Sequence, residues 1–454
     1  MSGLKLFYFV LFGQTISLLG TTLTNFGLGV WAYELSNEVT DFTSIAIAST
    51  LPGLVFGPFI GALIDRAKRK TILLCAQLGC ALVTVVLAAL YMTDQLTVWM
   101  IVIIVPVASV CTTMLQVGFT SSISLVVPKE SLSKANGMLM LGFGTVQLAG
   151  PMLAGLTLDT IGMRGIFIID IATFIVGLVT IAIVSLPTPK RDPDKEKFTL
   201  SHAFTDLVDA YRYMKKRKGL LSGLYVFTLV GFNVSVVQVL FLPLVLGLGT
   251  RTDLGFVQSV AGMGAVVGGI LMVVWKGASR QMYAVLGASL VVSVLLIIVP
   301  IGQEIWLLAV GGFFIMMVSP IAATSSQTLW QKKIAPSYQG RVFSLRNTIN
   351  RSAQPLAFLS AGFFADTYFE PHMVEGGVLA EYFGGIWGVG HSRGIALMIS
   401  FAGAISFVIV ALTWFAPGIR RCDIDIPDAI DDVVDTGTDD VGANKGSEVG
   451  TLQD

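Results

Sequence analysis

The fold is decided by the ten residues Gly61-Ala62-Leu63-Ile64-Asp65-Arg66-Ala67-Lys68-Arg69-Lys70 and by the apolar stretches at 43–64 and 70–91 that flank them. Each stretch is long enough for an α-helix to cross roughly 30 Å of hydrocarbon, which takes about 20 residues. Further stretches of this kind lie at 5–34, 97–126, 136–158, 165–187, 220–247, 253–275, 281–301, 304–328, 343–366 and 393–416. The sequence therefore predicts an all-α membrane protein with twelve transmembrane helices.

The composition agrees with lipid as the main solvent of this chain. Of the 454 residues, 54% are apolar and 13% are charged, and the mean hydropathy is +0.78. A soluble domain averages about 25% charged residues. The formal net charge of zero hides an asymmetry, because residues 423–454 contain ten acids and one Lys. This tail has no aromatic residue, and we expect it to be disordered.

The distribution of basic residues gives the orientation. With the N-terminus in the cytoplasm, every Lys and Arg except Arg164, Arg251 and Arg393 falls on the cytoplasmic side. Basic residues favour that side of a membrane. We therefore expect a multi-pass protein of the cell (inner) membrane with both termini in the cytoplasm. The first apolar run has no small-residue cleavage site, so we expect it to be retained as a helix.

An internal repeat divides the chain into two halves. Thr120-Ser121-Ser122 recurs as Thr324-Ser325-Ser326, and Gly155-x-x-x-Asp159 recurs as Gly362-x-x-x-Asp366, in the same order. Several matches in one order indicate a duplication. Two pseudo-symmetric six-helix bundles, with a substrate site between them near the midplane, are a known arrangement of transporters.

The repeat sets the expected domains. They are an N-terminal six-helix bundle over 1–187, a cytoplasmic linker over 188–219, a C-terminal six-helix bundle over 220–417 and the acidic cytoplasmic tail over 418–454. Within the linker, Leu200, Phe204, Leu207, Tyr211 and Met214 recur at helical spacing. We expect this amphipathic helix to lie on the inner membrane surface and to join the two bundles.

The stretch 61–70 resembles the signature between the second and third helices of the major facilitator superfamily. The matching residues are Gly61, Asp65, Arg66, Arg69 and Lys70. The resemblance implies the major facilitator fold and a gate, in which Asp65 meets the positive N-terminus of the eleventh helix when the inner side is shut. The alternative for the basic residues is simple anchoring of an inner loop.

A second motif lies in the fifth stretch and consists of Gly137, Gly150, Pro151 and Gly155. It is similar to the antiporter signature of exporters in this superfamily, although Val146 and Ala154 stand where the signature has glycine. The resemblance favours export over uptake. The alternative is an ordinary helix that is bent by its proline.

Three further segments are similar to the enterobactin-exporter and macrolide-efflux branch of the superfamily. They lie at 31–35, 127–137 and 336–343, and the resemblance as a whole covers residues 5–416. One position departs from the drug exporters. Many proton-coupled exporters have an arginine inside the membrane where this chain has Gln116. The coupling mechanism of those exporters therefore cannot be transferred to this chain.

Polar groups inside the apolar stretches form the candidate site, because charge in hydrocarbon is costly. The candidate coupling or charge residues are Asp170, Glu34 and Arg351. The candidate residues of a central substrate cavity are Gln14, Asn25, Gln116, Asn233, Gln238, Asn347, Asn350 and Gln354. Hydrogen bonding between helices is the alternative for each amide. For Asp170 the alternative is a packed role at the outer end of its helix. For Arg351 the expected role is that of a counter-charge, either for an anionic substrate or for a membrane carboxylate.

Together these features predict a secondary active transporter that exports amphipathic small molecules, drug-, macrolide- or siderophore-like, by alternating access and as a proton antiporter. An importer, or an exporter with one narrow substrate, is the alternative within this fold. A membrane enzyme would need clustered metal or acid–base groups such as a His-Glu-x-x-His pair, and a channel would need a repeated filter or a charged ring. The sequence contains neither pattern.

The expected partners follow from this prediction. They are a small-molecule substrate, a coupling proton and the lipid bilayer, and we expect the protein to act as a monomer. We expect no catalytic residue, no metal, no other cofactor and no nucleic acid, because the sequence has no metal-ligand spacing and no phosphate-binding loop.

Overall fold

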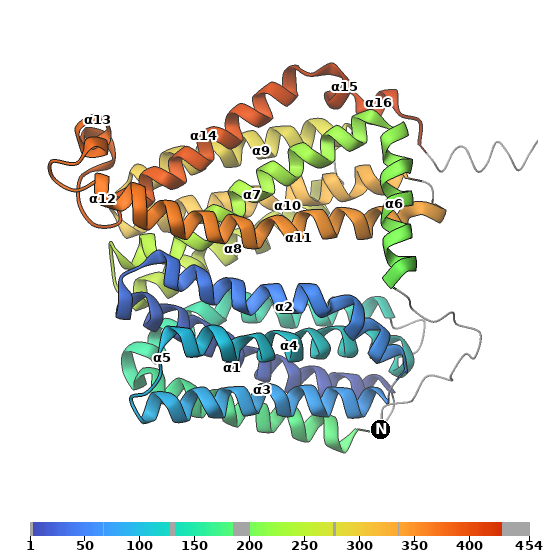
Figure 1. Cartoon of the computed structure of the whole chain (residues 1–454). Helices are drawn as coiled ribbons and strands as arrows, with labels where there is room; N and C mark the ends of the chain where they lie inside the picture. The colour runs from blue at the N-terminus through green and yellow to red at the C-terminus, as the bar shows by residue number, and fades with distance from the viewer. Residues whose placement is uncertain are drawn as a thin grey trace, which may run out of the picture.

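The chain is an all-helical membrane protein in its computed structural model (Figure 1). The structure describes residues 3–66, 68–127, 132–184, 200–275, 278–334 and 336–428, and these ranges contain helices and no strand. Residues 188–199 of the expected linker and 429–454 of the acidic tail lie outside the described residues. The all-α fold class predicted from the sequence is confirmed.

The first half of the chain forms helices whose bounds follow the apolar stretches within a few residues. They are α1 (Gly3–Ser36), α2 (Val39–Arg66), α3 (Arg69–Met92), α4 (Val98–Val126) and α5 (Leu132–Ile183). Long helices are the expected result, because backbone groups in hydrocarbon must find their hydrogen-bond partners within the segment. Only α5 differs from expectation, since it covers both the fifth and the sixth predicted spans.

The polypeptide reverses direction inside α5, at Gly162. The part before Gly162 runs parallel to α1 and the part after it runs antiparallel. The contacts are Gly142 with Thr15 and Gly150 with Thr22 before the reversal, and Gly20 with Thr173 and Gly13 with Thr180 after it. Gly162 has φ 67° and ψ −175°, a conformation that is essentially restricted to glycine. The expected loop between the fifth and sixth spans is therefore a single tight reversal.

The second half begins with the linker helix α6 (Leu200–Lys216) and ends with two short helices after the last span. Between them lie α7 (Lys218–Leu246), α8 (Arg251–Trp275), α9 (Gln281–Ile298), the 3₁₀ turn η2 (Val299–Ile301), α10 (Ile305–Lys333), α11 (Pro336–Phe364), the π-helical turn η3 (Ala365–Phe369), α12 (Glu370–His372), α13 (Val378–Trp387) and α14 (Arg393–Phe415). The chain then forms α15 (Pro417–Arg420) and α16 (Cys422–Asp425).

Among the described residues, 10 helices are long and apolar enough to cross a membrane. One of these is α5, which reverses and so contributes two crossings. The polar helix α11 is not among them, but its length of 29 residues equals that of α7. The two helices pack together, and Thr228 of α7 donates a hydrogen bond to Asn350 of α11 at 2.9 Å. This arrangement is compatible with twelve crossings.

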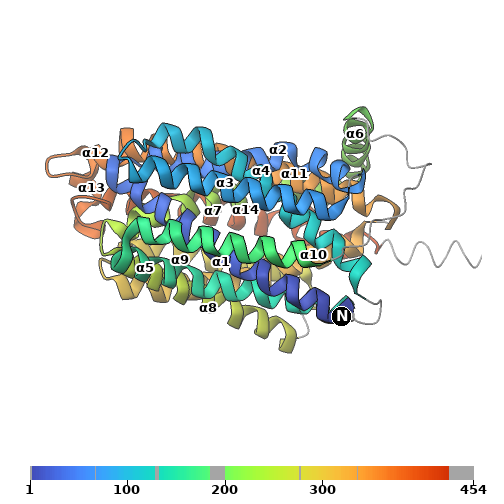
Figure 2. The same ribbon diagram turned by 90° about the horizontal axis from the view of Figure 1, so that it is seen from below.

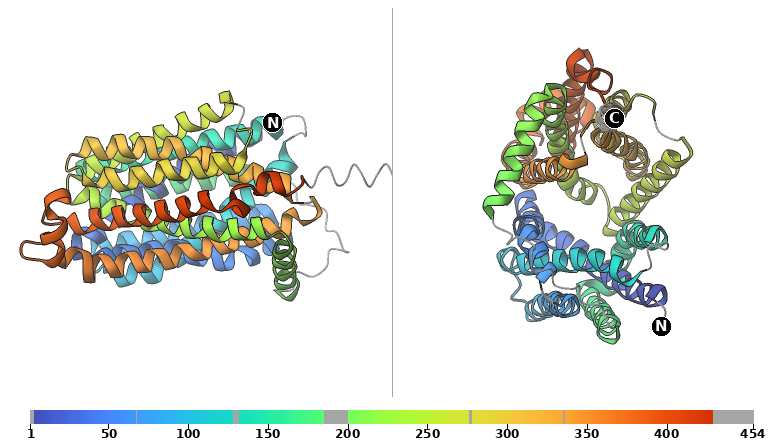
Figure 3. Two further views of the ribbon diagram at one scale, coloured as in Figure 1. Left: turned by 90° about the horizontal axis from the view of Figure 1, so that it is seen from above. Right: turned by 90° about the vertical axis from the view of Figure 1, so that its right-hand side faces the viewer.

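Two helical bundles lie side by side, α1–α5 in one and α7–α14 in the other (Figure 1). We call the end that holds α6 and the N-terminus the linker end, and the end that holds α12 and α13 the loop end. Figures 2 and 3 show the helices of both bundles running between these ends. The largest buried apolar cluster contains residues of both bundles, such as Val30, Phe167, Leu240 and Ile395. These residues lie toward the loop end, where the bundles are packed together.

The amphipathic helix α6 packs against the second bundle. Met214 is fully buried in a cluster with Trp330 and Val342, and the Tyr213 ring stacks on the Tyr338 ring with centroids 4.5 Å apart. Helices α10 and α11 cover part of its apolar face. The placement of this helix on the inner membrane surface stays a prediction.

The reversal at Gly162 can be tested with an alanine substitution. A side chain at this φ and ψ costs about 1–3 kcal/mol, so we expect Gly162→Ala to lower the midpoint of thermal unfolding of the purified protein. Gly144→Ala is the matched control on the same helix, because no atom lies within 4 Å of the added Cβ there. Alanine in a helix is about 0.5–1 kcal/mol more favourable than glycine. Equal unfolding midpoints for both variants would contradict this explanation of the reversal.

Candidate functional site

A large cavity lies between the two bundles. Its volume is about 1060 Å³, and its walls come from α1, α2 and α4 of the first bundle and from α11 of the second. Five of the residues predicted from the sequence line it, namely Asn25, Gln116, Asn347, Arg351 and Gln354. The volume lies at the upper limit of pockets that hold drug-sized molecules, about 300–1,000 Å³. We call this space the central cavity.

A second, smaller space lies inside the first bundle and is contiguous with the central cavity. It has a volume of about 370 Å³, is walled by α1, α3, α4 and α5, and shares Thr21, Thr112 and Gln116 with the central cavity. The predicted residue Gln14 lines it, and the Gln14 Nε2 atom is buried without a hydrogen-bond partner among the described residues. Most of the other lining residues are apolar. We call this space the N-half pocket.

The remaining predicted cavity residues lie elsewhere. Asn233 is buried and donates a hydrogen bond to the Leu229 carbonyl oxygen of its own helix at 3.1 Å. Gln238 is exposed, and neither residue lines the central cavity or the N-half pocket. Asn350 accepts the hydrogen bond from Thr228 and so joins α11 to α7. Of these three amides, Asn350 alone shows the alternative role, hydrogen bonding between helices.

Arg351 is the single charged residue among the described residues that line the two spaces. Its side chain is exposed to the central cavity, and it forms no ion pair with any described residue. Asn347 precedes it by about one helical turn and Gln354 follows it by about one turn, so the three side chains share one face of α11. The polar stripe predicted on this helix therefore faces the cavity.

Asp170 is buried inside the first bundle, where it joins three helices. Its side chain is 1% exposed, and its Oδ2 atom accepts hydrogen bonds from Thr24 Oγ1 of α1 at 2.7 Å and from Thr84 Oγ1 of α3 at 3.1 Å. The Oδ1 atom is buried and has no hydrogen-bond partner among the described residues. Asp170 lines neither space. It therefore has the contacts of a packed residue and one free carboxyl oxygen.

Asp170 nevertheless lies next to the N-half pocket. On each of the three helices that meet at its carboxylate, the residue about one turn nearer the linker end lines that pocket. These residues are Thr21 on α1, Cys80 on α3 and Phe174 on α5. One helical turn is about 5.4 Å along the axis. The Asp170 carboxylate therefore lies one turn beyond the end of the pocket that points toward the loop end.

The two bundles are joined at the loop end by an ion pair. Glu34, at the end of α1, accepts two hydrogen bonds from the Arg251 guanidinium at the start of α8, at 2.7 Å and 2.6 Å. Both side chains are more than a third exposed (36% and 39%). An exposed pair of this kind contributes about 0.2–1 kcal/mol. Glu34 thus forms a contact between the bundles in this structure, and its role in coupling stays a prediction.

Two Gly-x-x-x-Asp motifs make related contacts between the bundles at the same end. Asp366, just after α11, accepts the backbone N–H groups of Val39 and Thr40 at the start of α2, at 2.9 Å and 2.7 Å. Asp159 accepts a hydrogen bond from the Thr252 hydroxyl at the start of α8. Both carboxylates therefore meet the positive N-terminus of a helix in the other bundle. We call these contacts the aspartate clamps.

The antiporter-type motif provides the close approach that one clamp needs. Gly155 lies against the backbone of Arg251, and a Cβ built there would be 2.7 Å from the Arg251 oxygen. About one turn before Gly155 in α5, Pro151 faces Gly255 of α8, where a built Cβ would be 2.5 Å from the Pro151 oxygen. Gly150 faces α1 in the same way, with Thr22 as its neighbour. Small residues of this kind allow helices to pack at short distance.

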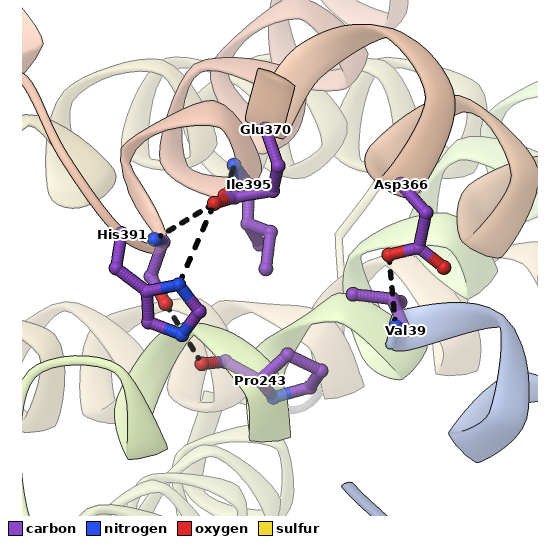
Figure 4. A network of polar contacts seen from close by, with 7 residues as sticks. Val39, Pro243, Asp366, Glu370, His391 and Ile395 are labelled. Carbon is purple, nitrogen blue, oxygen red and sulfur yellow. Dashed lines mark hydrogen bonds and ion pairs between the residues drawn. The ribbon is translucent and has the colours of Figure 1, made fainter. Parts of the chain in front are cut away.

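A half-buried carboxylate orders the loop beside the second clamp (Figure 4). The Glu370 oxygens accept the backbone N–H groups of Ser392 and Ile395 at the start of α14, at 3.0 Å and 2.9 Å, and His391 Nδ1 lies 3.9 Å away. Burial raises the pKa of Glu370 above its usual value, and the two backbone hydrogen bonds oppose that shift. Ser392 also donates to the Pro243 oxygen of α7 at 3.3 Å. The loop thus ties α7 and α14 together.

The predicted gate at 61–70 lies at the linker end, and the structure describes only part of it. The side chains of Asp65 and Arg66 at the end of α2 lie outside the described part of the structure. The surroundings of Gly61 and of Gly137, at the start of α5, lie outside it as well. Lys70 donates a hydrogen bond to the Ala182 oxygen of α5 at 2.6 Å. Arg69 is buried at the start of α3. The gating role of this motif stays a prediction.

The central cavity lies on the linker side of the closed loop end. Its walls reach Gly57 on α2, Thr120 on α4 and Phe343 on α11, all of which lie in the linker-side part of their helices. Beyond it, toward the loop end, α2 and α11 meet, where a Cβ built on Gly362 would be 2.4 Å from Thr43 Oγ1. The structure therefore has a cavity that is closed on the loop side.

Comparisons with known proteins agree with this geometry. The family model of the Major Facilitator Superfamily matches residues 10–358. The chain is similar to macrolide efflux protein A of Streptococcus pyogenes, with 26% identity over 371 residues that cover 79% of this chain and 89% of the relative. It is also similar to the multidrug resistance protein MdtG of Proteus mirabilis, with 27% identity over 387 residues, 80% of this chain and 89% of the relative.

Solved structures share the fold at low sequence identity. A bacterial homologue of the human lysosomal transporter Spinster, solved inward-facing and unoccupied, matches with a TM-score of 0.66 and 15% identity over 93% of this chain and 98% of that one. A bacterial homologue of the iron transporter ferroportin, in an inward-facing state, matches with a TM-score of 0.63 and 14% identity over 91% and 99%.

Several partners in the site are not singled out by the sequence. Thr24 and Thr84 are ordinary hydroxyl residues in apolar stretches, and only the fold places them beside Asp170. Arg251 could have been marked as a candidate, because it is one of three basic residues expected on the outer side. Asp159 could have been marked by its repeated Gly-x-x-x-Asp motif. The sequence does not state which residue either of them contacts.

The loop-end contacts can be tested by charge inversion. We expect Arg251→Glu to open the loop end, because it places a carboxylate beside Glu34, and the double variant Glu34→Arg/Arg251→Glu to close it again. The ion pair contributes about 0.2–1 kcal/mol, so the ratio of open to closed molecules should change by less than about tenfold. Distances between spin labels at the exposed residues Gln95 and Tyr382 report this ratio.

A matched control for this experiment is Arg164→Glu, which inverts an exposed arginine two residues after the reversal at Gly162. We expect its distance distribution to equal that of the wild type. If Arg251→Glu and Arg164→Glu gave the same distribution, the ion pair would have no part in holding the loop end closed.

Proposed function

Because the chain belongs to the Major Facilitator Superfamily, we propose that it is a secondary active exporter, which moves amphipathic small molecules across the cell membrane by alternating access. The observation that carries the proposal is the central cavity between the two bundles, closed on the loop side. The similarity to efflux proteins of other bacteria supports export over uptake. Transport, in contrast to catalysis, agrees with a cavity lined by amides, hydroxyls and apolar groups.

We propose that the linker end faces the cytoplasm of a cell whose inner membrane holds the protein. The distribution of Lys and Arg supports this orientation, since Arg164, Arg251 and Arg393 lie near the loop end. In this orientation the cavity is closed to the outside, which is the state in which an exporter loads its substrate. For an importer, the same geometry would be the state of release, so the direction of flux separates the two.

The proposed cycle requires the loop end to open when the linker end closes. The aspartate clamps and the Glu34–Arg251 pair would then separate, and the motif at 61–70 would take over on the other side. Asp65 ends a Gly-x-x-x-Asp sequence of the same form as the clamps. By analogy with Asp366, it would meet the N-terminus of α11 in that second state. Closure would therefore exchange one set of carboxylate–helix contacts for another.

We propose that Asp170 carries the coupling proton. It is the buried carboxyl within the first bundle, one helical turn from the N-half pocket, and one of its oxygens is free to hold a proton. A carboxyl inside a membrane protein is costly and usually functional. Its hydroxyl partners lie on α1 and α3. A change of its protonation would therefore act directly on the packing of helices that also line the pocket.

Transport in everted membrane vesicles tests the exporter. Radiolabelled erythromycin and radiolabelled cholate serve as probes, one a macrolide and the other an amphipathic carboxylate. We expect saturable uptake of at least one probe by vesicles that contain the protein, and loss of this uptake when a protonophore collapses the proton gradient. Uptake that does not saturate would favour a channel. Accumulation only in the opposite direction, in right-side-out vesicles, would favour an importer.

The role of Asp170 is tested by Asp170→Asn, which keeps the shape and an oxygen that accepts the threonine hydroxyls but cannot carry the proton. We expect uptake driven by the proton gradient to fall at least tenfold, while exchange of labelled for unlabelled substrate without a gradient persists. The matched control is Asp94→Asn, an exposed loop residue whose positive φ of 54° asparagine accepts. Full gradient-driven uptake by Asp170→Asn would contradict the coupling role.

A further inference from the structure

The described residues that line the two adjoining spaces carry a positive charge and no negative charge. Among the described residues that line them, the charged side chain is Arg351, and no carboxylate is present. Two of the candidate carboxylates are held elsewhere. Asp170 is buried behind the pocket with its threonine partners, and Glu34 is paired with Arg251 at the loop end. A molecule in the cavity therefore meets one positive charge that no described lining residue neutralises.

The groups around Arg351 suit an anion. Asn347 and Gln354 lie on the same face of α11, and Gln116 lines the cavity from α4. An amide group can donate hydrogen bonds, and an ionised carboxylate only accepts them. A guanidinium can bind a carboxylate with two parallel hydrogen bonds. This side of the cavity is thus built from donors around a cation.

The N-half pocket is richer in large apolar side chains than the central cavity. Eight of its 17 lining residues are aliphatic or aromatic, and most of the others are threonine or glutamine; the eight are Leu11, Leu18, Leu115, Phe119, Leu139, Phe143, Val146 and Phe174. Three residues line both spaces, Thr21, Thr112 and Gln116, so the pocket adjoins the central cavity. Burial of apolar surface there contributes about 25 cal/mol per Å². A molecule can therefore place a polar head in the cavity and an apolar body in the pocket.

We infer that the transported molecule is an amphipathic organic anion, whose carboxylate pairs with Arg351 while its apolar body occupies the N-half pocket. This inference rests on the proposed function, because it names the substrate class of the same cavity. A head with one negative charge matches one guanidinium. A doubly charged phosphate would leave one charge without a partner in a partly desolvated space, which is unfavourable.

The same geometry disfavours cationic molecules. An ammonium group in the central cavity would face Arg351 with no described carboxylate to pair with, and like charges repel more strongly in a partly apolar space than in water. The cavity would need an acid among its lining residues to select a base. Neutral molecules with the same apolar body should bind, but without the contribution of the ion pair.

Equilibrium binding to the purified protein in lipid nanodiscs tests this inference without requiring transport. Three radiolabelled probes share one steroid body: cholate, its neutral primary amide, and the corresponding primary amine. We expect cholate to bind the wild type roughly tenfold or more tightly than the amide, as is typical of a charge-assisted hydrogen bond. The amine should bind more weakly than the amide. An amine that binds as tightly as cholate would overturn the inference.

Substitutions at Arg351 assign the selectivity to that residue. Arg351→Gln keeps hydrogen-bond donors without the charge, and we expect it to bind cholate and the amide equally. Arg351→Lys keeps the charge without the planar fork, and should retain part of the preference for cholate. The amide serves as an internal control for folding, because its affinity should be similar in all variants. An unchanged ratio of cholate to amide affinity in Arg351→Gln would overturn the inference.

The matched control is Arg346→Gln, which removes a charge from the same helix outside the two spaces. The Arg346 guanidinium donates hydrogen bonds to Gln327 Oε1 at 3.1 Å and to Ser326 Oγ at 3.3 Å, and it lies over the Trp330 ring. We expect Arg346→Gln to keep the preference for cholate.

The outcome for the exporter is separate from this one. Charge-selective binding without gradient-driven uptake would support the substrate class and contradict the exporter. Gradient-driven uptake of a cation, together with equal binding of cholate and its amide, would support the exporter and contradict the substrate class.

Discussion

The aspartate clamps at the loop end rest on one electrostatic constraint, namely that helix N-termini are positive and leave backbone N–H groups without partners inside the helix. Asp366 satisfies two of these groups at the start of α2, and Asp159 accepts the side-chain hydroxyl of Thr252, the second residue of α8. Each aspartate ends a Gly-x-x-x-Asp motif whose glycine removes the side chain that would keep the helices apart. The two contacts are made in related ways by opposite bundles, as expected for a duplicated chain.

These contacts decide where the cavity lies. Where α5 approaches α8 and α2 approaches α11, little space is left between the bundles, so the open volume is found on the linker side. The polar contacts are individually modest, because the Glu34–Arg251 pair is exposed and the Asp159–Thr252 clamp is an exposed hydrogen bond. Small contributions of this size can be exchanged for an equivalent set at the other end.

Particular elements show how far the sequence can be read. The helix bounds were predictable, because the length and hydropathy of each stretch follow from the thickness of the hydrocarbon layer. The polar face of α11 was predictable from the spacing of Asn347, Arg351 and Gln354. The position of α6 was not, since an amphipathic pattern is the same whether its apolar face meets lipid or α11. Asn233 and Gln238 were predicted to line the cavity and do not, because spacing alone does not fix how a helix is rotated about its axis.

The sequence by itself determined that this chain is a polytopic helical protein with a duplicated plan, because hydrophobic length, basic asymmetry and repeated motifs are properties of the chain in one dimension. The tertiary structure decided which residues become partners. Asp170 with two threonines of other helices, Glu34 with Arg251, and Arg351 with a cavity free of described carboxylates are all products of contacts between distant segments. The physical reason is that the effect of a charged group depends on the groups around it. Those neighbours are in place only after the helices have packed.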